Sequence, residues 1–556
     1  MLCTDPLGAY WRFWKTLFVA SFPFLIFLCF PGFSNAQTRA RAFDLYPPTN
    51  DATPVLYQKS APAFQENGKD WSFSPGAEVK ISVDDTQAIR SVNPYLFGCN
   101  VACWDGKDWF LDPDRVEKAK QAGIKFWRWP GGVVADDYHW DNSYGSHHLN
   151  NKGEDITDMN GSWRVSTDDF IEFCRQTGSE AVVTVNYAAA RYENVQYAAD
   201  LAARWVKYFN IEKKFKVRYW EIGNECYGPW EEGNQMPGKP QLTGDVYGSD
   251  FLVMEAAMKK VDPDIYVGAV VFPKDGEDEW IGHHWWSKTL LTTVQNQADF
   301  LVFPEYFIWP FDTANHYTYP SDDELLSDVR EIQDDRDALG RIMNRYALEE
   351  RNIPIELTEF NILNIQSPPT IELISGLYNA EILGTLVEAG YGAANYWDWK
   401  NGLDPLYKGD HGMLADGDPS IPDATPRPAY YAYALYSRAF GDTSILSYSL
   451  DPKVKVYASR FSGGELGLVI VNENEDNRTL VFNFSDFQPK GRLMGWILNG
   501  SGMDDRNITW NGVSGLAGSG GPFPLDTISP YRMNFQADQP LQLNIPATSA
   551  VGIVVY

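Results

Sequence analysis

The stretch Val217-Arg218-Tyr219-Trp220-Glu221-Ile222-Gly223-Asn224-Glu225 decides the fold class of this chain. It begins as an apolar and aromatic run typical of a buried strand, and it ends at Asn-Glu before the loop Gly228-Pro229-Trp230. The stretch Ile353-Pro354-Ile355-Glu356-Leu357-Thr358-Glu359 repeats this design. Because polar residues at the carboxyl ends of parallel strands meet at one face of a barrel, Glu225 and Glu359 are expected at the same opening.

Apolar runs and helical patterns alternate along the rest of this region, which is typical of parallel βα units. Eight units are expected, and eight imply a (β/α)8 TIM barrel of the α/β class. The predicted strands are 95–100, 124–129, 181–186, 217–222, 265–272, 300–303, 353–357 and 393–397. The predicted helices are 114–121, 192–209, 251–261, 323–347, 371–389 and 429–440.

After Gly441 the sequence pattern changes to short stretches of alternating apolar and polar residues, separated by Gly, Asn and Pro turns. This pattern predicts a C-terminal antiparallel β-sandwich. A further alternating segment before the barrel can cross back to join that sandwich. The expected organisation is a signal peptide at 1–36, an N-terminal extension over the surface at 37–76, a sandwich strand at 77–90, the barrel at 91–441 and the sandwich domain at 442–556.

Size and charge restrict the classes of partner. With 556 residues the chain suits a large barrel with a smaller companion domain. A formal net charge of −28 argues against nucleic acid, whose phosphates need Lys and Arg, and disfavours a highly anionic substrate. Aromatic residues make up 15% of the chain, which fits either carbohydrate binding or core packing.

The first residues have the pattern of an export signal. Arg12 and Lys15 precede an apolar run over 17–30, and Ser34-Asn35-Ala36 provides small residues for cleavage. The mature protein is therefore expected to begin near Gln37, to be secreted or periplasmic, and to have no stable membrane span after cleavage. A retained anchor is the alternative, although the run is short for a span.

Neither the cysteines nor the histidines predict a metal centre. Removing the signal leaves four cysteines, of which Cys99 and Cys103 are near enough in sequence to pair, but none has zinc-ligand spacing. Adjacent histidines, as in His147-His148 and His283-His284, point apart and rarely bind one ion. No cofactor and no catalytic metal are expected.

Two glutamates at one barrel opening predict a glycosidase. One carboxyl can act as general acid and the other as nucleophile when a glycosidic bond breaks through an oxocarbenium-like transition state. Two surface glutamates in unrelated loops are the alternative interpretation. Glu221 and Glu356 lie earlier on the same strands and are expected to be buried partners instead.

The motifs resemble glycoside hydrolase clan A. They are Gly-Asn-Glu after the fourth strand, Arg128-Trp129-Pro130-Gly131-Gly132 after the second and the glutamate after the seventh. Within the clan, residues 77–556 resemble the family 51 α-L-arabinofuranosidases most, with families 39 and 30 related. The resemblance implies a retaining enzyme with Glu225 as acid/base and Glu359 as nucleophile. Retention requires the two carboxyl groups to be about 5 Å apart.

The resemblance also implies roles in substrate binding. Asn224 would bind the sugar 2-hydroxyl, or else serve as a turn residue. Arg128 would hold the nucleophile ionised, or else form a structural ion pair. Tyr306 would donate to Glu359, or else pack in the core.

Two weaker candidates complete the predicted site. Trp397 would provide a sugar platform, or else pack in the core. Asn186 ends the third strand and is a candidate for a polar subsite contact.

Two departures from the family pattern bear on the substrate. Pro304 stands where clan members often have a histidine, and Glu359 lies in Thr-Glu-Phe-Asn. Glu305 could add a carboxylate to the pocket or cap its strand. The expected function is a secreted, arabinofuranosidase-like glycosidase acting on oligo- or polysaccharide of plants or algae. The alternatives are a β-xylosidase, an endo-glycanase such as an endoglucanase, xylanase or agarase, and a non-catalytic carbohydrate-binding barrel.

Overall fold

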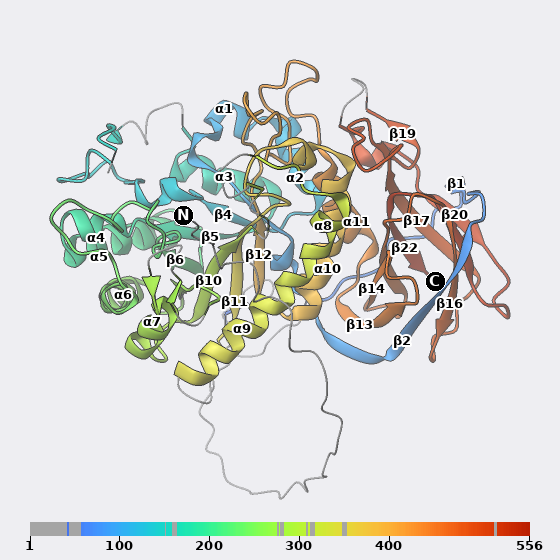
Figure 1. Cartoon of the computed structure of the whole chain (residues 1–556), viewed down its shortest axis with the longest axis horizontal. Coiled ribbons are helices and arrows are strands. Elements are labelled where there is room, and N and C mark those ends of the chain that lie inside the picture. The colour runs from blue at the N-terminus through green and yellow to red at the C-terminus, as the bar shows by residue number, and fades with distance from the viewer. Residues whose placement is uncertain are drawn as a thin grey trace, which may run out of the picture. The chain divides into compact units, whose positions relative to one another are not determined.

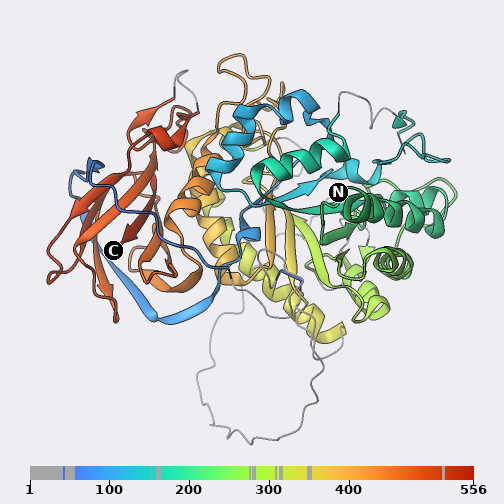
Figure 2. The ribbon, with the colours of Figure 1, turned by 180° about the vertical axis from the view of Figure 1, so that it is seen from behind.

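A computed structural model describes residues 42–43, 57–150, 152–157, 164–274, 277–278, 283–306, 308, 310–311, 317–346, 353–515 and 520–556. The predicted signal peptide lies outside these residues. Within them, a helix-covered barrel stands beside a mostly stranded domain, and α10 and α11 lie between the two (Figures 1 and 2). Among the described residues, no helix has the length and apolar character needed to cross a membrane.

Eight parallel strands close into the predicted barrel, so the fold class is confirmed. The strands are β3 (Gly98–Asn100), β4 (Phe126–Trp129), β5 (Glu180–Val185), β6 (Tyr219–Ile222), β7 (Tyr266–Val270), β10 (Phe300–Glu305), β11 (Ile355–Phe360) and β12 (Ala393–Tyr396). The first strand begins later than expected. A 3-10 turn, Pro94–Phe97, precedes it, because the Asn93 side chain accepts from the Tyr95 amide and proline favours the first turn.

Helices cover the outside of the barrel (Figure 1). They are α1 (Lys107–Phe110), α2 (Pro113–Ala122), α3 (Thr167–Thr177), α4 (Ala188–Tyr192), α5 (Val195–Val206), α6 (Gly244–Val261), α7 (Trp286–Val294), α8 (Asp322–Ser327), α9 (Glu331–Tyr346), α10 (Leu373–Ala389) and α11 (Pro428–Ala439). Helix α3 was not expected, although Ser166 and Asp169 form a capping box at its start. The helix predicted over 192–209 begins later, at α5, because the Asn194 side chain caps its first turn, and a π-helical segment (Lys207–Glu212) continues it.

The second domain is one continuous sheet rather than two separate antiparallel sheets. Its main order is β1-β20-β17-β22-β15-β14-β13-β2-β16-β21. The bounds are β1 (Lys69–Asp70), β2 (Ala77–Ser91), β13 (Thr443–Ser449), β14 (Val454–Arg460), β15 (Leu466–Asn472), β16 (Arg478–Phe484), β17 (Arg492–Asn499), β18 (Thr509–Trp510), β19 (Val513–Ser514), β20 (Tyr531–Asn534), β21 (Gln542–Ile545) and β22 (Ser549–Val555). Strands from both ends of this order contribute to one apolar core, so the sheet curves around it.

Strand β2 ties the N-terminal part of the chain into this domain. It pairs antiparallel with β13 and parallel with β16. The β2–β16 pairing and the short β1–β20 pairing are therefore exceptions to the expected antiparallel arrangement. On the barrel side, α10 is buried along nearly its whole length, because it packs against α11 and against β15 and β22.

The expected N-terminal extension does more than lie over the surface. Phe43 is buried, and its ring stacks on Tyr219 with centroids 4.7 Å apart. It also meets Phe126 and Phe300 edge to face. These three partners are the first residues of β6, β4 and β10, so Phe43 closes the end of the barrel opposite the candidate site. Burying this aromatic ring stabilises the closed barrel.

Candidate active site

The chain turns sharply where β6 ends. Gly223 has a φ of +76°, and a Cβ there would come within 2.4 Å of Cys226 Sγ and 2.8 Å of Tyr187 Cβ. Glycine tolerates both the left-handed backbone and this close approach. Glu225, two residues later, also has a positive φ of 35°, which is unfavourable for a residue with a Cβ. The turn directs Glu225 away from the strand and into the opening.

Two aromatic residues from the following loop hold the Glu225 carboxyl. Tyr227 donates its hydroxyl to Glu225 Oε1, and Trp230 donates Nε1–H to Oε2, both at 3.1 Å. Burial and the neighbouring charge of Glu359 raise the pKa of Glu225 to about 7, although these two hydrogen bonds oppose the shift. A carboxyl with this pKa carries a proton over much of the neutral range, as a general acid requires.

Glu359 lies within β11 and is 5% exposed. Its Oε1 accepts from Arg128 Nη1 at 2.9 Å, and its Oε2 accepts from the Tyr306 hydroxyl at 3.0 Å. The predicted hydrogen bond from Tyr306 is therefore present. Burial raises the pKa of Glu359 above its usual value, and Arg128 and Tyr306 oppose this rise by stabilising the carboxylate. Both oxygens thus have a donor that favours the ionised form.

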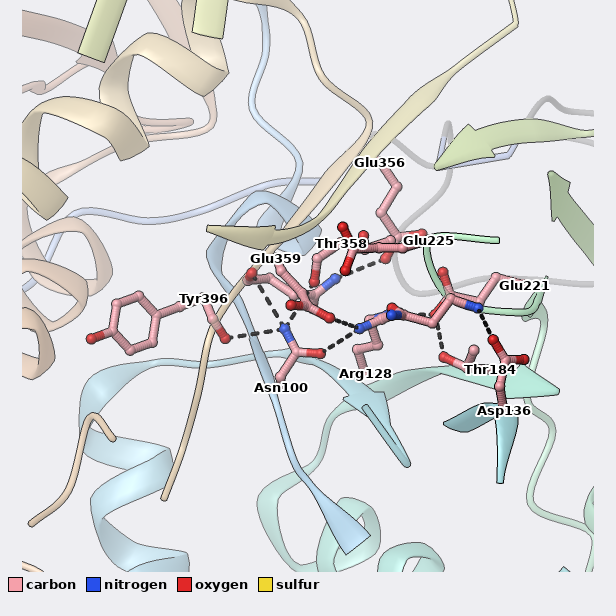
Figure 3. Close-up of polar contacts among 12 residues, drawn as sticks. Asn100, Arg128, Asp136, Thr184, Glu221, Glu225, Glu356, Thr358, Glu359 and Tyr396 are labelled. Atoms are coloured by element: carbon pink, nitrogen blue, oxygen red, sulfur yellow. Dashed lines mark hydrogen bonds and ion pairs between the residues drawn. The ribbon is translucent and has the colours of Figure 1, made fainter. Parts of the chain in front are cut away.

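Arg128 is the centre of the site (Figure 3). Besides Glu359, its guanidinium donates to Glu221, to Asn100 Oδ1 at 3.0 Å and to Asn224 Oδ1 at 2.8 Å. Burial disfavours its charge, but Glu221 and Glu359 outweigh that effect and raise the pKa of Arg128. The buried cation is therefore compensated by two carboxylates, as a buried charge must be.

Asn224 is oriented by three contacts. Its Oδ1 accepts from Arg128, its Nδ2 donates to Glu231 Oε1 at 2.9 Å, and its backbone amide donates to Asp136 Oδ2 at 3.2 Å. The side chain is therefore fixed with its carbonyl toward Arg128. An amide nitrogen carries two hydrogens, so one remains to meet a ligand.

The two glutamates deeper in the barrel are buried partners, as expected. Glu221 accepts from Arg128 and from Thr184. Glu356 accepts from Asn395 Nδ2 at 2.7 Å, and burial raises its pKa well above the usual value. Both are fully buried, which separates them from the opening that Glu225 occupies.

Trp397 packs against the Gly131–Gly132 turn. A Cβ at Gly132, whose φ is +59°, would lie 2.5 Å from the Trp397 ring. The ring is 8% exposed and meets Trp104 edge to face. Trp397 therefore packs against its neighbours, and its role as a sugar platform stays a prediction.

Asn186 makes two structural hydrogen bonds, and its subsite contact stays a prediction. Its Oδ1 accepts from the Ala189 amide at 2.9 Å, and its Nδ2 donates to the Tyr138 carbonyl at 3.4 Å. Because its carbonyl caps the first turn of α4, the side chain faces the backbone. Asn186 lies between the end of β5 and the start of α4. Its position at a strand end therefore fits a helix cap as well as a ligand contact.

The departures around β10 have a structural explanation. Pairing between β10 and β11 shifts at Pro304, which stands opposite Glu359. Glu305 then accepts from the Tyr306 amide at 3.1 Å, which fits the capping role, and a carboxylate contribution to the pocket stays a hypothesis. Burial, followed by the charge of Asp335, raises the pKa of Glu305 to about 8. The irregularity brings Tyr306 to the carboxylate it contacts.

Sequence reasoning missed several residues that position the site. Asn100, Asp136, Glu231, Tyr227 and Trp230 contact the predicted residues directly. Trp230 and Tyr227 belong to the loop quoted for its Gly-Pro-Trp sequence, and Asn100 ends a predicted strand. No sequence pattern singled out Asp136 or Glu231. Asp136 contacts Asn224 from a different loop, and Glu231 contacts it across an irregular loop.

The candidate disulfide is absent from the described residues. Cys99, Cys103, Cys174 and Cys226 are all free and buried. Cys103 Sγ instead lies 3.6 Å from Arg164 Nη1, as an acceptor. Burial raises the pKa of these thiols, which makes them unreactive packing residues.

Part of the chain is similar in sequence to known proteins. Residues 118–301 match the family described as the alpha-L-arabinofuranosidase 1 domain. A probable alpha-L-arabinofuranosidase C of Aspergillus terreus is 26% identical over 186 residues, which cover 30% of this chain and 33% of that protein. An intracellular exo-alpha-(1->5)-L-arabinofuranosidase of Halalkalibacterium halodurans is 24% identical, covering 41% of this chain and 46% of that protein. The chain thus spans about a third to a half of these curated relatives.

Solved structures extend the likeness to both domains. The GH51 alpha-L-arabinofuranosidase of Thermotoga petrophila superposes with a TM-score of 0.64 at 18% identity, covering 86% of this chain and all of that one. The resemblance to clan A and its family 51 is confirmed. A Paenibacillus polymyxa xyloglucanase of family 44 superposes with a TM-score of 0.58 at 16% identity, also over 86% of this chain. At these identities the structural likeness shows the fold.

Proposed function

We propose that this protein is a retaining glycoside hydrolase that releases α-L-arabinofuranosyl groups from plant or algal polysaccharide. The observation that carries the proposal is the contrast between its two carboxyls. Glu359 has a donor on each oxygen, one of them a buried cation, whereas Glu225 has a pKa of about 7 and two neutral donors. A pair with one ionised and one protonated member is what the reaction needs.

In the first step, Glu359 attacks the anomeric carbon while Glu225 gives its proton to the leaving oxygen. The glycosidic bond breaks, and an ester bond forms between Glu359 and the sugar. In the second step, the ionised Glu225 takes a proton from water, whose oxygen attacks the anomeric carbon and releases Glu359. Two inversions give net retention of configuration.

Arg128 and Tyr306 share one role in this reaction, and Asn224 has another. Each stabilises negative charge on one Glu359 oxygen, so they keep the nucleophile ionised before attack. Asn224 has its remaining Nδ2 hydrogen for the sugar 2-hydroxyl, where charge changes as the oxocarbenium ion develops. Its fixed orientation means that little reorganisation accompanies the reaction.

The arabinofuranosyl preference rests on the alpha-L-arabinofuranosidase 1 domain match, which includes Arg128, Asn224 and Glu225. Export rests on the N-terminal sequence pattern. N-terminal sequencing of protein recovered outside the cytoplasm should give a start near Gln37. An uncleaved N-terminus in the membrane fraction would contradict export.

The activity test compares 4-nitrophenyl α-L-arabinofuranoside, 4-nitrophenyl β-D-xyloside and a panel of arabinan, xylan, xyloglucan and agarose. We expect the arabinofuranoside to be the best aryl substrate, and proton NMR to show the α-anomer of arabinose first. An initial β-anomer would overturn retention. Activity on the xyloside alone would reassign the enzyme as a β-xylosidase.

An endo-glycanase is the second candidate, because the fold is shared with the family 44 xyloglucanase and with CelM2, a bifunctional glucanase-xylanase. An endo enzyme would lower the viscosity of a polymer much faster than it releases monosaccharide. Absence of turnover on the whole panel, together with specific binding to one polymer, would instead favour a carbohydrate-binding barrel.

A further inference from the structure

Three buried side chains form a cluster next to the candidate active site but outside it. Asp137 follows the η3 turn (Val133–Asp136) after β4, His147 lies further along the same loop, and Glu232 lies in the loop after β6. One ligand atom from each lies within 4.8 Å of the other two. Their exposed fractions are 7%, 0% and 5%. The candidate mechanism uses none of the three.

The hydrogen bonds around His147 fix its tautomer. The Ser143 carbonyl accepts from His139 Nδ1 at 2.8 Å, because a carbonyl cannot donate. A neutral His139 therefore has its lone pair on Nε2, which lies 3.0 Å from His147 Nδ1. His147 must donate from Nδ1, and a neutral His147 then presents a bare lone pair at Nε2. A metal-binding histidine has this arrangement, with its other nitrogen donating to a second residue.

The lone pair of His147 is directed into the cluster. Its Nε2 lies 3.3 Å from Asp137 Oδ1, and within the part of the chain that the structure describes neither atom has a hydrogen-bond partner. A hydrogen on Nε2 would thus be poorly aligned with the carboxylate. His147 Nε2 and Asp137 Oδ1 are both buried acceptors, so a positively charged group must lie near both atoms. Its position must be to one side of the line that joins them.

The spacing suits a divalent cation. Two ligands bound about 2.0–2.1 Å from a tetrahedral zinc ion are about 3.3 Å apart, which is the observed separation of His147 Nε2 and Asp137 Oδ1. One imidazole and two carboxylates suit zinc and similar transition metals better than the all-oxygen sites of calcium or magnesium. Water would complete the coordination.

Glu232 is held in place for this role. Tyr192, the last residue of α4, donates its hydroxyl to Glu232 Oε2 at 2.9 Å. The Tyr192 ring also stacks on His147, with centroids 4.0 Å apart and planes 10° from parallel. Tyr192 therefore orients both the Glu232 carboxylate and the His147 imidazole.

We propose that Asp137, His147 and Glu232 bind one zinc-like divalent cation that fixes the loops after β4 and β6. The cation is structural. Two of the proposed ligands directly follow residues that contact Asn224 in the candidate active site. Asp137 follows Asp136, and Glu232 follows Glu231. Binding would thus neutralise two buried carboxylates and hold the loop that carries Glu225.

The test uses the whole mature protein, purified without a histidine tag and dialysed against EDTA. Titration calorimetry with Zn²⁺, Mn²⁺, Ca²⁺ and Mg²⁺ should show one equivalent of Zn²⁺ per chain, with weaker or no binding of Ca²⁺ and Mg²⁺. Zn²⁺ should raise the melting temperature by several degrees, because it binds the folded state alone. Co²⁺ should give the visible absorption of a tetrahedral site with imidazole and oxygen ligands.

His147→Gln should abolish stoichiometric Zn²⁺ binding and the thermal shift. His148→Gln is the matched control, because His148 is adjacent in sequence but exposed, and it should bind like the wild type. If His147→Gln does not fold, Glu232→Gln decides, since its amide oxygen can still accept from Tyr192. Wild-type protein that binds no Zn²⁺, or variants at His147 and Glu232 that bind it normally, would overturn the proposal and assign a proton to the cluster.

Discussion

Arg128 on β4 donates to Glu359 on β11 at 2.9 Å, across the interior of the barrel. The same guanidinium reaches Asn224 at 2.8 Å. One buried cation therefore sets the position of the proposed nucleophile and of the amide proposed to bind the sugar. Because the guanidinium is planar and has five donors, it can hold several acceptors in fixed directions at once.

Glu359→Gln should lower turnover by several orders of magnitude while the fold stays intact. An amide cannot form the glycosyl ester, although it can still accept from Tyr306. Initial rates on the best aryl glycoside, with circular dichroism and melting temperature, measure the effect. Glu78→Gln, an exposed position on β2, is the control and should keep wild-type rates. Near wild-type turnover of Glu359→Gln would remove the assignment.

Glu225→Ala should impair substrates with poor leaving groups far more than activated aryl glycosides, since the former alone need protonation. Azide should restore turnover of the activated substrates by attacking the glycosyl enzyme in place of water. The measurement is a plot of kcat/KM against leaving-group pKa, with and without azide. Equal losses on both substrate types, without rescue, would contradict the acid/base role.

Trp230→Phe should move the basic limb of the pH profile to higher pH. Burial and Glu359 raise the pKa of Glu225 to about 7, and the Trp230 hydrogen bond opposes that rise. Its loss should raise the pKa further, so the protonated acid persists at higher pH. The profile of kcat/KM reports this pKa in the free enzyme. Trp109→Phe, which is outside the site, should leave the limb in place, and a downward shift for Trp230→Phe would refute the argument.

Arg128→Met should destabilise the protein by about 3–5 kcal/mol, because it leaves the buried Glu221 and Glu359 without their cation. Denaturant unfolding measures the change. Arg128→Lys restores the charge but cannot reach four acceptors, so it should recover part of the stability and little of the activity. Full activity of Arg128→Lys would show that the positioning of Glu359 and Asn224 does not depend on the guanidinium.

Removal of the residues after Phe440 should give an insoluble barrel or one with a much lower melting temperature. Strand β2 would lose β13 and β16, and α10 and α11 would lose the strands they pack against. An unpaired strand and an exposed apolar surface both favour aggregation. Solubility and calorimetry test this. A soluble barrel with full activity would show that the stranded domain is separable.

The sequence by itself determined the barrel and placed the two glutamates of the candidate site at strand ends. Each strand is an apolar run of the length that a buried parallel strand needs, and both glutamates come at strand ends, so local patterns carry the information. Glu221 and Glu356 could be separated from them because the side chains of a parallel strand occupy fixed depths along it.

Tertiary structure alone decided which side chains meet. The contacts of Arg128 with residues on three other strands, β3, β6 and β11, depend on how far the strands are staggered, and no local pattern records that stagger. The plug formed by Phe43 and the cluster of Asp137, His147 and Glu232 likewise depend on contacts between segments that are far apart in the sequence. Local sequence sets the preferences of a segment, whereas contacts between distant segments are set by the closure of the barrel and the packing of its loops.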